Sequence, residues 1–130
     1  MTVVVDASAL VAMALAELER SSFERIVAQT DTLLATPVNL MEAGIILILR
    51  EKRFTADEYH RWLEDLDIVS SDLVNEREAL DAYMRWGKGV HRAGLNMGDC
   101  FAYALAKALD APLLYKGDDF PQTDVRSALD

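Results

Sequence analysis

Residues 3–10 read Val3-Val4-Val5-Asp6-Ala7-Ser8-Ala9-Leu10, and this stretch decides how the rest of the chain is interpreted. Three consecutive β-branched residues predict a short buried strand, which Asp6 closes. The segment from about Ser8 to Leu18 is rich in Ala, Leu and Met and predicts a helix. Short strands alternating with helices indicate a parallel α/β sheet, whose sites lie beyond the carboxyl ends of the strands. Asp6 occupies such a place.

The remaining sequence continues this alternation. Thr36 and Pro37 mark a helix start, with Thr as N-cap and Pro at the first helical position. Ser21 and Glu24 match the spacing of a capping box and predict another helix start. The expected strands cover residues 3–5, 33–35, 68–69 and 113–115, and the expected helices cover residues 8–18, 21–29, 37–50, 72–86 and 99–109, with one more that opens at residues 55–58.

Composition points to one compact domain that spans residues 1–130. Hydrophobic residues make up 52% of the 130 and charged residues 27%, which is ordinary for a globular protein. The longest purely aliphatic stretch, Ile45–Leu49, is far shorter than the roughly 20 residues that span a bilayer, so no membrane association is expected. The only cysteine, Cys100, has no partner for an internal disulfide, and we therefore expect a cytoplasmic protein.

The formal net charge of −9 argues against a nucleic-acid partner only superficially, because the distribution of charge decides. Two basic clusters stand out. Solvated cations near helix C-termini explain each cluster by itself, but a position near acidic residues would allow them to bind phosphate. The first cluster contains Arg85, Lys88, His91 and Arg92, and the second contains Arg50, Lys52 and Arg53.

Acidic residues recur where strands stop and helices start. Asp6 follows the first strand, Asp99 follows a turn, and Asp118 and Asp119 follow the last strand. Each has an ordinary explanation as a cap or turn residue. If they converge, however, they repel one another, and a divalent cation with a preference for oxygen ligands, such as Mg²⁺ or Mn²⁺, relieves that repulsion. A bound cation of this kind activates water in many phosphodiesterases.

Glu42 is the acid that a structural role explains least well. It lies within residues 38–47, a helix that is apolar on nearly every side and therefore expected to be buried. A glutamate is almost never buried without a partner, because an unpaired charge in an apolar medium is costly. Either a cation or a basic residue of another protein would offset that cost.

Taken together, these motifs resemble those of the PIN domain, and more narrowly the VapC-type toxin ribonucleases. The resemblance covers essentially the whole chain and rests on the residue 3–10 motif, Glu42, Leu-Asn-Met-Gly-Asp-Cys at residues 95–100 and Lys-Gly-Asp-Asp-Phe at residues 116–120. It implies a three-layer sandwich with a central parallel sheet, and RNA cleavage that depends on Mg²⁺ or Mn²⁺. It also implies inhibition by a VapB-type antitoxin and assembly as a homodimer, with tRNA or another structured RNA as a candidate substrate.

The same resemblance assigns the site residues. Asp6, Glu42 and Asp99 match the three best-defined acids of the family and would be catalytic residues and metal ligands. The fourth is Asp119, the acid immediately before Phe, with Asp118 as the alternative. Ser8 matches a small hydroxyl residue that supports a metal ligand.

Two other functions compete with this hypothesis. A PIN-like module that binds RNA or protein without cleavage would have the same fold. Against this alternative, none of the four acidic positions has been lost from this chain. A phospho-acceptor signalling domain is also acidic and α/β, and Lys116 could imitate its lysine, but no aspartate ends a strand mid-chain. His60 and His91 are expected at the surface, and Cys100 is expected to be a small buried side chain.

Overall fold

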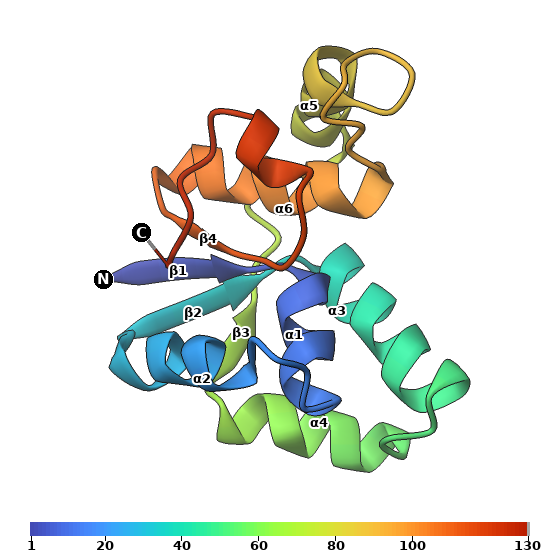
Figure 1. The fold of residues 1–130 in the computed structure, drawn as a ribbon, viewed down its shortest axis with the longest axis vertical. Coiled ribbons are helices and arrows are strands. Elements are labelled where there is room, and N and C mark those ends of the chain that lie inside the picture. Colours follow the sequence, from blue (N-terminus) through green and yellow to red (C-terminus); the bar gives the residue numbers. More distant parts are fainter. Residues whose placement is uncertain (130) are drawn as a thin grey trace.

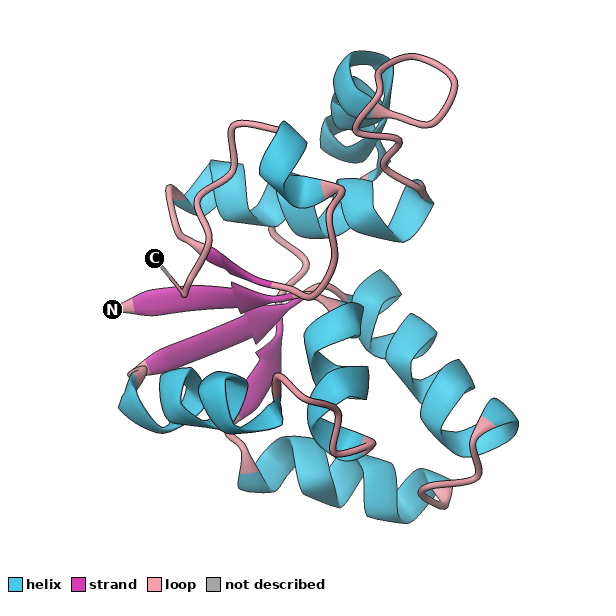
Figure 2. Cartoon of the chain, in the orientation of Figure 1, coloured by secondary structure: helices cyan, strands magenta, loops and turns pink. Residues whose placement is uncertain are grey.

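The computed structural model describes residues 1–129 and has a parallel sheet between two layers of helices (Figures 1 and 2). The strands are β1 (Thr2–Val5), β2 (Thr32–Ala35), β3 (Ile68–Ser70) and β4 (Leu113–Leu114), in the spatial order β3-β2-β1-β4. Because every pairing is parallel, the carboxyl ends of all these strands lie along one edge of the sheet. The expected three-layer α/β architecture is therefore confirmed.

Helices connect the strands and cover the two faces of the sheet (Figure 1). They are α1 (Ala7–Ala14), α2 (Arg20–Gln29), α3 (Pro37–Gly44) with its π-helical continuation η1 (Ile45–Arg50), α4 (Ala56–Asp65), α5 (Glu76–Trp86), α6 (Met97–Leu109) and the 3₁₀ turn η2 (Phe120–Gln122). Within residues 1–129, none of the helices is long and apolar enough to cross a membrane.

The alternation of side chains along β1 builds two cores. Val3 and Val5 point to the face covered by α1, α2, α3 and α4, where Phe23 is the largest fully buried side chain. Val4 points to the opposite face, beneath α5 and α6. Figure 1 shows α6 above the sheet and α2 and α4 below it. The three valines of the opening motif are fully buried, so this strand lies at the centre of the molecule.

The C-terminal segment covers the free edge of β4. The Leu113 N–H donates to Arg126 O at 2.8 Å, and the Ala128 N–H donates to Leu113 O at 2.9 Å. The segment therefore extends the sheet by one parallel bridge, between Leu113 and Ser127. This pairing satisfies backbone groups of a strand that would otherwise be exposed at an edge.

Two helix boundaries differ from the expectation at the end of α1 and the start of α2. Helix α1 ends at Ala14 rather than Leu18, because Ala16 has a φ of 54° and closes a Schellman turn in which the Glu17 N–H donates to Ala12 O. Helix α2 begins at Arg20, and no side chain caps it. The expected Ser21–Glu24 capping box was wrong, since Glu24 instead pairs with Arg20 at 3.1 Å.

The starts of the later helices α3, α4, α5 and α6 are set by N-cap residues. Thr36 caps α3, as predicted. Helix α4 opens at the expected residues 55–58, where Thr55 and Glu58 form a capping box. Helix α5 starts at Glu76 rather than 72, because Asn75 and Glu78 form its capping box. Helix α6 starts at Met97 rather than 99, since Asn96 is the N-cap and Asp99 is the third helical residue.

Candidate active site

Asp6 is the most deeply buried of the candidate acids, with 3% of its surface exposed. It is the N-cap of α1, and its Oδ2 accepts hydrogen bonds from the backbone N–H and the hydroxyl of Ser8. Its other oxygen, Oδ1, is buried and has no hydrogen-bond partner among the described residues. A buried carboxylate oxygen without a donor is costly, so a bound cation would stabilise Asp6.

Ser8 connects Asp6 to the end of β4. Its hydroxyl donates to Asp6 Oδ2 and accepts a hydrogen bond from the Lys116 N–H at 2.9 Å. The Lys116 side chain turns away and pairs with Glu17 and Glu19, at 3.1 and 3.4 Å. Lys116 is therefore not a free lysine of the kind that a phospho-acceptor site requires.

Glu42 lies half-buried on α3 and faces the first turn of α6. A β-carbon built on Gly98 would come 2.6 Å from Glu42 Oε1, so only glycine leaves room for the carboxylate here. Burial raises the pKa of Glu42 and the charge of Asp99 raises it further, while the Asn39 side chain lowers it. The backbone N–H groups of the first turn of α6, which have no carbonyl partner within the helix, favour a negative charge at this place.

Asp99 has two roles that the sequence offered as alternatives. Its Oδ2 accepts from the Asn96 N–H at 3.0 Å, and its own N–H donates to Asn96 Oδ1 at 2.8 Å, so it completes a capping box. Burial raises the pKa of Asp99 to about 6 against the effect of the Asn96 bond, and the charges of Asp6 and Asp119 contribute to the rise. Asp99 thus caps α6 and also lies within reach of other acids.

The structure distinguishes the two acids after β4. The charge of Asp119 raises the pKa of Asp99, whereas Asp118 has no such effect on the site. Both side chains are exposed, and Asp119 precedes the buried Phe120 at the start of η2. Of the two, Asp119 is therefore the one whose charge acts on Asp99.

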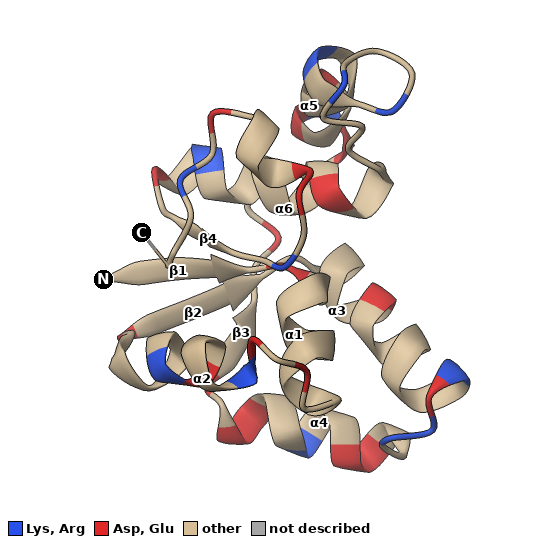
Figure 3. Ribbon diagram, in the orientation of Figure 1, with Lys and Arg blue, Asp and Glu red and all other residues tan. Residues whose placement is uncertain are grey.

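Charges within this set of acids therefore act on the ionisation of Asp6, Glu42 and Asp99. Burial raises the pKa of Asp6 to about 6, and Glu42 adds to that rise; Asp6 in turn raises the pKa of Asp99. Figure 3 shows acidic segments in α3, at the start of α6 and in the loop after β4, around the carboxyl ends of the strands. This is the edge of a parallel sheet where ligands bind.

The four candidate acids offer oxygen ligands of the kind that a hard divalent cation prefers, but by themselves they do not form a complete coordination site. The candidate ligands are carboxylate oxygens, and Asp6 Oδ1 is a buried oxygen with no donor among residues 1–129. Nevertheless, among residues 1–129 no three His, Cys, Asp or Glu side chains are close enough together to hold an ion by themselves.

One of the two basic clusters, that of Arg50, Lys52 and Arg53, contributes a side chain to a pocket beside Glu42. A pocket of about 390 Å³ is lined by Glu42 and Arg50, by apolar residues of α3 and η1, and by residues 96–98 at the start of α6. In the other cluster, Arg85 lies 3.8 Å from Asp124 and stacks on Trp86. Arg50 is therefore the cation best placed to meet a phosphate beside Glu42.

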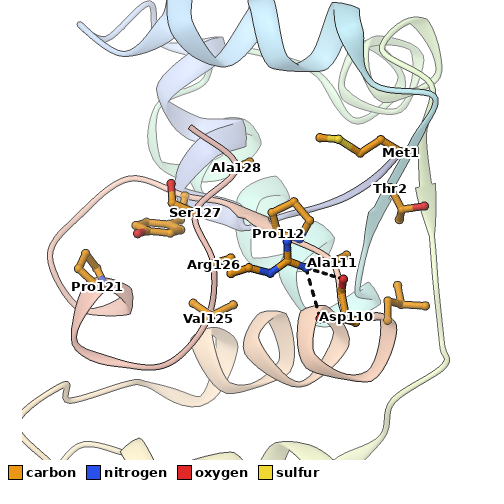
Figure 4. Close-up of a pocket in the computed structure, with 12 residues that line it drawn as sticks. Met1, Thr2, Asp110, Ala111, Pro112, Pro121, Val125, Arg126, Ser127 and Ala128 are labelled. Atoms are coloured by element: carbon orange, nitrogen blue, oxygen red, sulfur yellow. Dashed lines mark hydrogen bonds and ion pairs between the residues drawn. The ribbon is translucent and has the colours of Figure 1, made fainter. Parts of the chain in front are cut away.

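Another cavity, of about 830 Å³, lies at the opposite end of the sheet (Figure 4). Its lining includes Met1 and Thr2 at the start of β1 and Pro112 just before β4, and Arg126 crosses it to bond Asp110. Among the described residues, its lining includes none of the four candidate acids. Because it adjoins the amino ends of the strands, we do not assign the chemistry to it.

Sequence reasoning missed Asn39 and Gly98, which arrange the site without carrying charge. Asn39 is fully buried and its side chain bonds Gly98 O. A polar residue one turn before Glu42 in an apolar helix was the available signal. The expectations for other polar residues held in part: His60 is exposed, Cys100 is buried, and His91 is half-buried and accepts the Ala93 N–H.

Comparison with known proteins places this geometry in a family. The family model for the PIN domain matches residues 3–126. Ribonuclease VapC30 of Mycobacterium tuberculosis is 40% identical over 126 residues, which cover 94% of this chain and 95% of that protein. Ribonuclease VapC of Mycolicibacterium smegmatis is 40% identical over 124 residues, with 94% and 96% covered. The chain belongs to the PIN-domain family, and within it to the VapC ribonucleases.

A solved structure agrees with the fold. The crystal structure of Mycobacterium tuberculosis VapC20, described as a toxin that cleaves the sarcin–ricin loop, superposes with a TM-score of 0.67 and covers 95% of each chain. At 16% sequence identity, this likeness concerns the fold alone.

Proposed function

We propose that this chain is an endoribonuclease that depends on Mg²⁺ or Mn²⁺ and acts as the toxin of a toxin–antitoxin pair. The observation that carries the proposal is Asp6 Oδ1 at the carboxyl end of β1, a buried carboxylate oxygen that has no hydrogen-bond partner among residues 1–129. Its carboxyl group is coupled by charge to those of Glu42 and Asp99. Membership of the VapC ribonucleases supports RNA as the substrate. The single domain spanning residues 1–130 stays a prediction.

Asp6, Glu42, Asp99 and Asp119 are the residues that would hold the cation. When bound, such an ion lowers the pKa of a water molecule and balances charge on the scissile phosphate. Ser8 holds Asp6 Oδ2, so that Oδ1 is left for a ligand. Glu42 and Asp119 would bind a second ion through water or orient the attacking water.

The RNA itself would approach across the pocket that Glu42 shares with Arg50. A guanidinium binds phosphate oxygens in a planar, two-pronged geometry and would offset the net charge of −9 locally. We propose tRNA or another structured RNA as the substrate class.

The proposed partner is a VapB-type antitoxin that places a basic side chain near Asp6 and Asp99. An arginine bridges carboxylates and competes with the metal for them, which would inhibit cleavage. We further propose a homodimer in the cytoplasm. Expression of the chain alone should arrest growth, and co-expression with the product of a neighbouring antitoxin gene should restore it.

A non-catalytic PIN-like binding module is the second candidate. It is favoured by the finding that, within residues 1–129, no three possible ligands are close enough to hold an ion unaided. Such a module would bind RNA or protein equally well with and without divalent cations.

The test is incubation of the purified chain with total RNA in Mg²⁺ or in EDTA, followed by mapping of the new RNA ends. The proposal requires cuts at defined positions that occur in Mg²⁺ and stop in EDTA. Binding of RNA without new ends in either condition would instead identify a binding module.

A further inference from the structure

Asn39 is a polar residue in a place where an apolar one would be expected. Its side chain is fully buried within α3, and a buried amide is costly unless its groups are paired. Both ends are paired here. Nδ2 donates to Gly98 O at 2.9 Å, and Oδ1 accepts from the Thr36 hydroxyl at 2.5 Å. An amide is suited to this place because it donates and accepts at once.

These bonds join the two helices that carry the acids. Asn39 lies one turn before Glu42 on α3, and Gly98 immediately precedes Asp99 on α6. Glu42 faces this turn of α6 across the gap between the helices, since a β-carbon built on Gly98 would stand 2.6 Å from Glu42 Oε1. The bond from Asn39 to Gly98 joins residues 59 positions apart and holds the two turns together beside the acids.

We infer that Asn39 is a positioning residue, which holds Glu42 and Asp99 at the spacing that a divalent cation needs. This inference rests on the proposed function. Asn39 does not bind the ion; it fixes the first turn of α6 against α3, so that the two carboxylates approach before a cation arrives. Outer residues that orient metal ligands commonly change metal affinity by about 10- to 100-fold when they are removed.

Tyr59 offers a matched control. Its hydroxyl donates to Leu40 O at 2.6 Å, so it too ties a distant helix to α3 through one part-buried hydrogen bond. That bond joins α4 rather than α6, and it holds neither acid. Tyr59→Phe removes it without changing the shape of the ring.

The experiment measures the affinity of the RNA-free protein for Mn²⁺ alone, by calorimetric titration, in wild type, Asn39→Ala, Asn39→Leu and Tyr59→Phe. Thermal unfolding is followed in the same samples. We expect both Asn39 variants to bind Mn²⁺ at least about tenfold more weakly than wild type. Tyr59→Phe should stay within about twofold of wild type although its melting temperature also falls.

Other results overturn the inference. Equal Mn²⁺ affinities in the Asn39 and Tyr59 variants would show that Asn39 only stabilises the fold. Failure of both Asn39 variants to fold would do the same, because the residue would then be part of the core alone. A wild-type chain that binds no Mn²⁺ would contradict the proposed function itself, and the positioning role with it.

Discussion

The carboxylate of Glu42 lies against the α-carbon of Gly98, so closely that a β-carbon on Gly98 would stand 2.6 Å from Glu42 Oε1. The atom that would have to move is the far end of a flexible side chain, not backbone. A substitution at Gly98 therefore acts on the acid and spares the helix.

We accordingly predict that Gly98→Ala lowers the rate of RNA cleavage at least tenfold while the protein stays folded. Alanine favours a helix over glycine by up to about 1 kcal/mol, so the free energy of unfolding should be unchanged or higher. Gly44→Ala, on the same helix as Glu42, is the control, because its β-carbon meets only the Tyr59 ring at 3.1 Å. Equal cleavage by Gly98→Ala and wild type would mean that the position of Glu42 is unimportant.

Asp99→Asn should abolish cleavage and leave the metal-free protein at least as stable as wild type. Asparagine retains an oxygen to accept the Asn96 N–H, and it removes a charge that burial and neighbouring acids disfavour. The loss of a favourable charge at the helix start opposes this by about 0.3–1 kcal/mol. Chemical denaturation measures the balance, and marked destabilisation would favour a purely structural capping role.

The adjacent acids Asp118 and Asp119 form a matched pair. Of the two, Asp119 is the one whose charge contributes to the raised pKa of Asp99, so Asp119→Asn should reduce cleavage and metal affinity, whereas Asp118→Asn should leave both near wild type. Both side chains are exposed, so neither change should alter the melting temperature by more than about 2 °C. The reverse ranking of the two variants would reassign the fourth acid.

The metal-free protein should lose stability as the pH rises from about 4 to about 6. The folded pKa of Asp6 lies at about 6, above its ordinary 3.8, so the folded state binds the proton more tightly than the unfolded state. The free energy of unfolding begins to fall as the pH passes the ordinary pKa of 3.8, and the fall is complete above about pH 6. The contribution of Asp6 to this fall is on the order of 2–3 kcal/mol. Melting curves across this range check the sign.

Divalent cations should reverse that loss at neutral pH. An ion that binds only the folded acids stabilises them by about 2.7 kcal/mol when its concentration is 100 times its dissociation constant. Mn²⁺ should therefore raise the melting temperature of wild type and fail to raise that of Asp99→Asn. Identical shifts in both proteins would place the ion elsewhere.

The sequence predicted those features that depend on local pattern. Thr36 and Thr55 mark helix starts because each cap bonds a backbone N–H three residues away. The end of α1 was missed because Ala16 takes a left-handed conformation that usually signals itself by glycine. The Ser21 prediction failed because the preceding turn runs directly into α2.

Likewise, the candidate acids could be named from the sequence, because Asp6 and Asp119 follow strands, Asp99 follows a turn and Glu42 lies in an apolar helix, and because the motifs resemble those of a known family. The residues that arrange them could not be named in this way. Asn39 bonds a carbonyl 59 residues away, and Gly98 matters only because Glu42 lies against it. A polar residue within an apolar helix was a local signal for Asn39, but the sequence does not say what either residue contacts, since both contacts depend on how α3 meets α6.

The central claim is that these acids hold a divalent cation on which RNA cleavage depends. The most direct test strips the purified chain of metal with EDTA, removes the chelator, and measures cleavage of an RNA substrate as Mn²⁺ is added back. Wild type should be inactive without metal and recover with Mn²⁺, while Asp6→Asn and Asp99→Asn, purified identically, should stay inactive at every concentration. The account would be contradicted if the stripped wild type cleaved RNA without added metal. It would also be contradicted if the Asp6→Asn and Asp99→Asn variants cleaved RNA as fast as wild type.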